Sequence, residues 1–194
     1  EWFLGFLRQV NDDQMLYNFR DAAGQNKKGA PEMIGWDAPD SSLRGHTTGH
    51  YLSGLALCYR ATGSPVIREK AEYMVHALRE CQTALHEKKG CHKGFLSGYG
   101  EEQFDRLEQL VRYPEIWAPY YTLHKILAGL LDCYEFAGCD EALTIAGDLG
   151  DWVYERLSKV PHAQLNRMWS LYIAGEFGGM NDAMARLYTH TAKP

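Results

Sequence analysis

The sequence predicts an all-α protein in which repeated antiparallel helical hairpins form part of an (α/α)6 toroid. Two observations carry this prediction: apolar residues recur at three- and four-residue spacings over long stretches, and one helix-and-turn segment occurs three times. The alternation typical of strands is hard to find over five or more residues. The chain has 194 residues, 45% of them hydrophobic, which suffices for one core. We therefore expect one domain over 1–194, an incomplete α/α barrel.

The internal repeat defines the hairpins. Gly54–Pro65 aligns with Gly129–Asp140, which starts 75 residues later, and a weaker third copy, Ala185–Pro194, closes the chain. In each copy an apolar helical pattern reaches a Tyr, and a turn with Gly or Pro follows. Gly63 and Gly138 suit the left-handed position that ends a helix.

A second amphipathic helix follows each of the first two turns, over Val66–Leu85 and Glu141–Leu157. Each unit is therefore a helical hairpin. The repeat is too long for tetratricopeptide or ankyrin solenoids, which repeat at about 33–34 residues. The extra length leaves room for loops at one end of a toroid whose inner helices surround a cavity. Two helices, Trp2–Val10 and Gln14–Ala23, are expected before the first unit.

The third copy contains a first helix, Asn181–His190, and its turn, but no second helix. An unpartnered amphipathic helix would leave its apolar stripe in water, at about 25 cal/mol per Å². We therefore expect the natural polypeptide to continue, with this chain as its N-terminal part and the remainder as its partner. The sequence does not indicate a compartment or an oligomeric state.

Composition disfavours several classes of function. The net charge of −5 and the lack of long basic runs argue against nucleic acid, and no run approaches the roughly 18 apolar residues of a membrane span. The five cysteines form no Cys-x-x-Cys pair, so neither a zinc ribbon nor a redox motif is indicated. We predict no metal site on this chain.

Clusters of polar and aromatic residues precede the predicted inner helices, where loops concentrate function. In the first, Trp36 offers a flat ring, and His46 and His50 are spaced to share one helix face. The two histidines could bind a metal, line a polar pocket or be structural residues whose hydrogen bonds are satisfied within the protein. The second cluster contains Tyr121 and His124, and His124 lies near the repeat equivalent of His50. We expect these histidines to converge on one cavity.

The third cluster precedes the last helix. Glu176 could bind a sugar hydroxyl, act in acid–base catalysis or stabilise the helix start electrostatically. Phe177 follows it, and Asn181 is the expected N-cap. We predict that substrate binding involves Trp36, His46, His50, Tyr121, His124, Glu176, Phe177 and Asn181, with Glu176 as the only catalytic candidate.

Several of these motifs occur together in the order found in one enzyme group. The chain resembles the β-L-arabinofuranosidase glycoside hydrolases, families 127 and 146, formerly domain of unknown function 1680. The motifs that carry the resemblance are Gly35–Asp40, Leu43–Leu52, Pro119–Ile126, Ala128–Asp132, Asp151–Tyr154 and Glu176–Asn181.

The resemblance implies an (α/α)6 barrel and retaining, exo-acting hydrolysis of β-L-arabinofuranosides in plant glycans. It also implies a cysteine nucleophile on a zinc ion held by cysteines and a Glu, with a separate Glu as acid–base. The family's zinc cluster includes adjacent cysteines, which this chain lacks. We therefore expect zinc in the full-length enzyme, none bound by this chain, and no activity from this chain alone.

The same residues are also compatible with two other functions. A non-catalytic helical-repeat module could bind a glycan or a protein through the same loops. Another α/α-toroid carbohydrate enzyme, a lyase or an epimerase, would also use His, Tyr and Glu in a central cavity.

Overall fold

The computed structural model describes residues 1–171 and 177–193. This part of the chain contains α-helices and one short 3-10 helix and no strand, so the all-α prediction is confirmed. The helices are α1 (Trp2–Gln9), α2 (Asp12–Met15), α3 (Tyr17–Ala22), η1 (Gly35–Asp37), α4 (His46–Thr62), α5 (Pro65–Lys89), α6 (Glu102–Glu108), α7 (Pro119–Ala137), α8 (Asp140–Leu157), α9 (His162–Trp169) and α10 (Gly178–Thr191).

Two helical hairpins form the body of the molecule, as the repeat predicts. Two residues join α4 to α5, and two join α7 to α8. The turns begin at Gly63 and Gly138, whose φ angles of 64° and 69° lie in the left-handed region that glycine adopts without strain. Pro65 then starts α5, where its missing N–H costs no helical hydrogen bond.

The third copy of the repeat ends in the same way. Ala192 occupies the position of Gly63 in the alignment, and its φ of 51° is also left-handed. Its N–H donates to the carbonyl of Tyr188 (2.8 Å), as that of Gly63 donates to Tyr59 (2.7 Å). The prediction that Asn181 caps this helix is wrong, because α10 already begins at Gly178.

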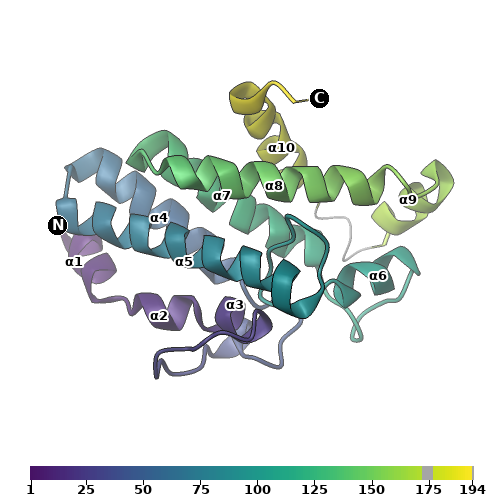
Figure 1. The fold of residues 1–194 in the computed structure, drawn as a ribbon, viewed down its shortest axis with the longest axis horizontal. Coiled ribbons are helices and arrows are strands. Elements are labelled where there is room, and N and C mark those ends of the chain that lie inside the picture. The colour runs from purple at the N-terminus through teal and green to yellow at the C-terminus, as the bar shows by residue number, and fades with distance from the viewer. Residues whose placement is uncertain (172–176, 194) are drawn as a thin grey trace.

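The first helices of the three copies lie side by side in the same direction. Gly49 of α4 faces Lys125 of α7, while further along the Cys133 thiol lies 3.7 Å from the carbonyl of Leu52. On the other flank of α7, Gly179 of α10 lies against His124. Helices α5 and α8 form a second layer over α4 and α7 (Figure 1). This arrangement is consistent with part of an α/α toroid.

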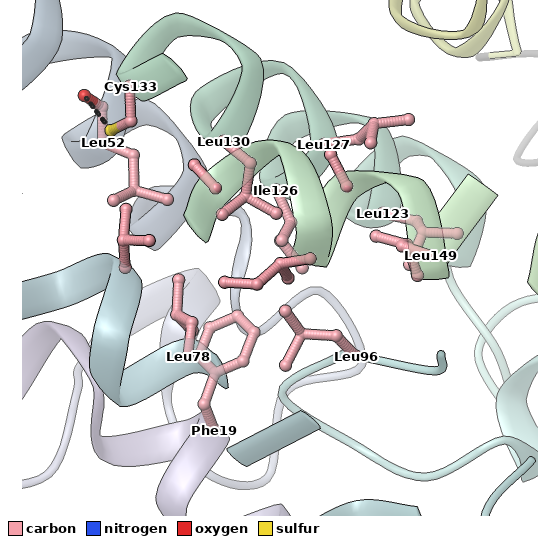
Figure 2. Close-up of a cluster of buried hydrophobic side chains, with 14 of the residues drawn as sticks. Phe19, Leu52, Leu78, Leu96, Leu123, Ile126, Leu127, Leu130, Cys133 and Leu149 are labelled. Carbon is pink, nitrogen blue, oxygen red and sulfur yellow. Dashed lines mark hydrogen bonds between the residues drawn. The ribbon is translucent and has the colours of Figure 1, made fainter. Parts of the chain in front are cut away.

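Apolar side chains between the two layers make one continuous core. Figure 2 shows Leu123, Ile126, Leu127 and Leu130 of α7 meeting Leu52, Leu78 and Leu149 from the neighbouring helices, with Phe19 and Leu96 below. All of these side chains are fully buried. Their burial provides the main favourable free energy that holds the layers together.

The segments outside the repeats differ from expectation in two ways. The predicted helix Gln14–Ala23 is divided at Leu16 into α2 and α3. The long linkers contain two short helices, α6 and α9, which lie together at one end of the molecule (Figure 1). Among the described residues, no helix combines the length and the apolar character that crossing a bilayer requires.

Candidate functional site

A close approach of two glycines positions the candidate site. An added Cβ at Gly49 would lie 2.7 Å from the backbone nitrogen of Ile126, and one at Gly129 would lie 2.8 Å from the Cβ of Leu52. Both distances are shorter than a real side chain allows. Helices α4 and α7 therefore touch through their backbones, which brings their N-terminal turns together.

Asp37 fixes the loop that precedes α4. Its carboxylate is buried and accepts hydrogen bonds from the Gly45 N–H (2.6 Å) and from the Thr47 hydroxyl. The Asn18 side chain donates to the Asp37 carbonyl at 2.8 Å. Gly45 has a φ of 103°, so the tight entry into α4 also requires glycine. This anchoring makes the start of α4 rigid.

The same carboxylate sets the tautomer of His46. The Nδ1 atom of His46 lies 3.0 Å from the Leu43 carbonyl and 3.1 Å from the Asp37 carboxylate, and both oxygens are acceptors. Nδ1 therefore carries the proton, which leaves Nε2 as an acceptor when the ring is neutral. An acceptor at this position suits a ligand hydroxyl.

Four rings from α4 and α7 form a continuous line, which we call the histidine row: His50, His46, Tyr121 and His124. The ring of His46 lies 6.2 Å from that of His50 and 6.2 Å from that of Tyr121, and the Tyr121 ring lies 5.6 Å from His124. The structure thus brings together four of the predicted site residues.

Burial and a neighbouring cation keep two of these rings neutral. Burial lowers the pKa of His124 to about 4, and the charge of Lys125 acts in the same direction. The pKa of His50 is also lowered, first by desolvation and then by Lys125. The Lys125 ammonium lies 5.0 Å from the centre of the Tyr121 ring. At neutral pH the rings of His50 and His124 are therefore neutral, and they lie near the Lys125 ammonium.

Helix α10 closes one side of the row. An added Cβ at Gly179 would lie 2.7 Å from the Cδ2 atom of His124, so this glycine lets the ring pack directly against the helix start. Phe177 and Asn181 lie elsewhere, in a groove of about 440 Å³ that α8 and α9 also line. Phe177 packs there on Trp169, with ring centres 5.4 Å apart. Glu176 lies outside the described residues.

The predicted residue Trp36 is linked to the histidine row through its chain neighbour Asp37. It is 67% exposed and lies beside Asp37, which holds His46. Sequence reasoning did not select Asp37, Lys125 or Trp117, although Asp37 and Lys125 occur inside the motifs that it used and Trp117 lies two residues before one of them. No capping signal in the sequence points to Asp37, because it lies eight residues before Gly45, the N-cap of α4.

The cysteines are poorly suited to nucleophilic chemistry. Cys58, Cys81, Cys133 and Cys139 are buried, and Cys91 is half-buried. Burial raises the pKa of Cys81 to about 12 and that of Cys139 to about 11. A nucleophilic or zinc-bound cysteine needs a thiolate, which these surroundings disfavour. No cluster of three metal-binding side chains occurs within residues 1–171 and 177–193, so the described residues do not fit a zinc–thiolate centre.

Comparison with known proteins identifies the family. No curated protein matches the sequence. The model of the β-L-arabinofuranosidase GH127 catalytic domain matches residues 2–194, nearly the whole chain. The polar rings at the starts of α4 and α7 accompany this match, and the chain belongs to the GH127 family of glycoside hydrolases.

Proposed function

We propose that the histidine row binds the terminal furanose ring of a β-L-arabinofuranoside, and that the full-length protein hydrolyses this sugar with retention of configuration. Two findings support the proposal. The first is membership of the GH127 family. The second, which carries it, is the line of four rings from α4 and α7 in which His46 is oriented by the buried Asp37.

The chemistry of the row matches a sugar. A furanose presents several hydroxyl groups, each of which donates and accepts hydrogen bonds. Neutral imidazoles offer one donor and one acceptor nitrogen, and the lowered pKa values of His50 and His124 keep both rings in this form. Lys125 supplies further donors. A few polar groups placed beside apolar ring faces are typical of small-molecule sites.

The proposed nucleophile and zinc ion need residues other than those described here. The family resemblance implies a cysteine thiolate, and burial raises the pKa of the Cys81, Cys133 and Cys139 thiols, which disfavours their thiolates. We therefore place the nucleophile and the zinc ligands outside 1–194, so that this chain binds the sugar without cleaving it. Glu176 remains a candidate acid–base residue.

Isothermal calorimetry with methyl β-L-arabinofuranoside tests the binding step. His50 is exposed, so His50→Ala should leave the fold intact and remove one or two hydrogen bonds to the sugar. We expect about fivefold weaker binding, which corresponds to roughly 1 kcal/mol. His76→Ala is the matched control, because His76 is an exposed histidine of α5, in the second layer of helices. Equal affinity in the His50 variant and the wild type would contradict the proposed site.

A hydrolysis assay tests whether the 194-residue chain binds the sugar without cleaving it. The 194-residue chain should release no arabinose from the same glycoside, whereas the full-length protein should release it with retained configuration. Turnover by the 194-residue chain would place a nucleophile within it. Sugar binding by the full-length protein without any turnover would instead favour the non-catalytic binding module.

A further inference from the structure

Three aromatic side chains lie in a line, and two of them are exposed and one is half-buried: Trp36 and Tyr113, with Trp117 between them. We call this line the aromatic platform. The rings of Trp36 and Trp117 lie 6.4 Å apart, and those of Trp117 and Tyr113 lie 5.6 Å apart. Trp36 is 67% exposed and Tyr113 is 59% exposed. Large apolar rings gathered at the surface indicate a binding site more often than a chance feature.

The packing of the three rings leaves flat faces open. Trp36 meets Trp117 at an interplanar angle of 66°, and Tyr113 meets Trp117 at 73°. In such edge contacts the rings hold one another in place without covering both faces of each ring. Contact with a flat apolar ligand can therefore bury further area on Trp36 with little loss of side-chain entropy.

The platform is continuous with the histidine row along two segments of the chain. In η1, Trp36 is exposed while the adjacent Asp37 points inward and contacts His46. In the second segment, Trp117 directly precedes the cap of α7, and Tyr121 in the first turn of that helix belongs to the row. Each segment thus contributes one residue to the platform. The first segment also contributes Asp37, which contacts a ring of the row, and the second contributes Tyr121, which belongs to the row.

We infer that the aromatic platform binds the sugar residues that follow the terminal arabinofuranose in a neutral oligosaccharide. The C–H faces of sugar rings are apolar and flat, so they stack on Trp faces, whereas their hydroxyls need polar partners such as those of the row. The inference rests on the proposed function, because the row must hold the terminal sugar for the next residues to reach Trp36.

The test is a length series measured by calorimetry: methyl β-L-arabinofuranoside, an arabinofuranose disaccharide and a trisaccharide. In the wild type, affinity should rise with length. In Trp36→Ala and in Trp117→Ala, the ratio of trisaccharide to monosaccharide affinity should fall about tenfold. Trp36→Phe keeps a ring and should retain most of the ratio. The matched control is Trp2→Ala, because Trp2 is a tryptophan of α1 that is 83% exposed. This variant should keep the wild-type ratio.

The outcomes separate this inference from the proposed function. Unchanged length dependence in both the Trp36 and the Trp117 variants overturns the platform, while the His50 result still decides the sugar site. A wild type that binds all three lengths equally also overturns it, and the exposed rings are then better explained as a protein contact. Monosaccharide binding that is insensitive to His50→Ala overturns the proposed function and this inference with it, because the platform then has no terminal sugar held beside it, even if Trp36→Ala loses the length dependence.

Discussion

Helix α7 has two flanks that are packed by different means. Against α4 it makes backbone contact through Gly49 and Gly129, surrounded by buried apolar side chains. Against α10 it makes ion pairs: Arg186 lies 2.7 Å from Asp132 and 3.0 Å from Glu135, and His190 lies 2.9 Å from Glu135. The three copies of the repeat are thus related in sequence, but their mutual contacts are not equivalent.

This difference in packing determines which parts of the candidate site are rigid. Close packing is insensitive to salt and pH and tolerates little change in shape. Ion pairs that water reaches are weak and are screened by salt. The start of α4 and the start of α7 therefore form the rigid part of the site, and α10 forms the part that conditions can loosen.

The largest expected effect concerns the glycine contact. Gly49→Ala should lower the free energy of unfolding by about 3 kcal/mol or more, because the methyl group would meet backbone atoms of α7 that cannot move aside. Urea unfolding measures the change. Gly147→Ala in α8 is the matched control: nothing lies within 4 Å of its added Cβ, and higher helix propensity should stabilise it by up to about 1 kcal/mol. Similar losses in both variants would contradict the close-contact model.

The next effect concerns pH. Since the pKa of His124 is about 4 in the folded protein and near 6.5 in the unfolded chain, the unfolded chain binds the extra proton between these values. The contribution of His124 to the free energy of unfolding should therefore be largest above about pH 6.5 and should decrease as the pH drops towards 4. The loss is at most about 3 kcal/mol, and less where water reaches the ring.

Urea unfolding at pH 7 and pH 4.5 measures this dependence in the wild type and in His124→Gln. The variant should lose the part that His124 contributes and keep the part that comes from His50, whose pKa is also lowered. His162→Gln, which changes an exposed histidine of α9, should keep it. An unchanged slope in His124→Gln would mean that another group causes the pH dependence.

Two adjacent glycines at the start of α10 provide a matched pair of variants that tests whether this helix influences the histidine row. Gly179→Ala should displace the His124 ring and weaken arabinofuranoside binding by about tenfold, because its methyl group would overlap the imidazole. Gly178→Ala should bind like the wild type, since no atom lies within 4 Å of its added Cβ. Calorimetry compares the two. Equal affinities would show that α10 does not influence the row.

The smallest effect concerns the ion pairs of α10. Arg186→Ala should reduce amide hydrogen-exchange protection along α10 by roughly 1 kcal/mol, with little change in α4. Added salt should act in the same direction. Arg68→Ala is the control, because it removes an exposed ion pair with Glu72 within α5. Protection that is unaffected in α10 would show that apolar contacts such as Leu187 hold this helix.

Local patterns predicted the helices well where burial is periodic. The hairpins and the turns at Gly63 and Gly138 follow from spacing and from the conformational freedom of glycine. The start of α10 and the break at Leu16 were mispredicted, because caps and breaks depend on tertiary contacts as much as on residue type. Short helices such as α6 carry too few turns for a periodic signal.

By itself, the sequence determined the all-α class, the repeated hairpins and the residue types that gather near the inner helix starts, because each depends on spacing along the chain. Only the tertiary structure decided which of those residues meet. It joined His46, His50, Tyr121 and His124 through a glycine contact, and it placed Phe177 and Asn181 in a separate groove. The physical reason is that the proximity of helices distant in sequence is set by how closely their surfaces pack, which no single segment encodes.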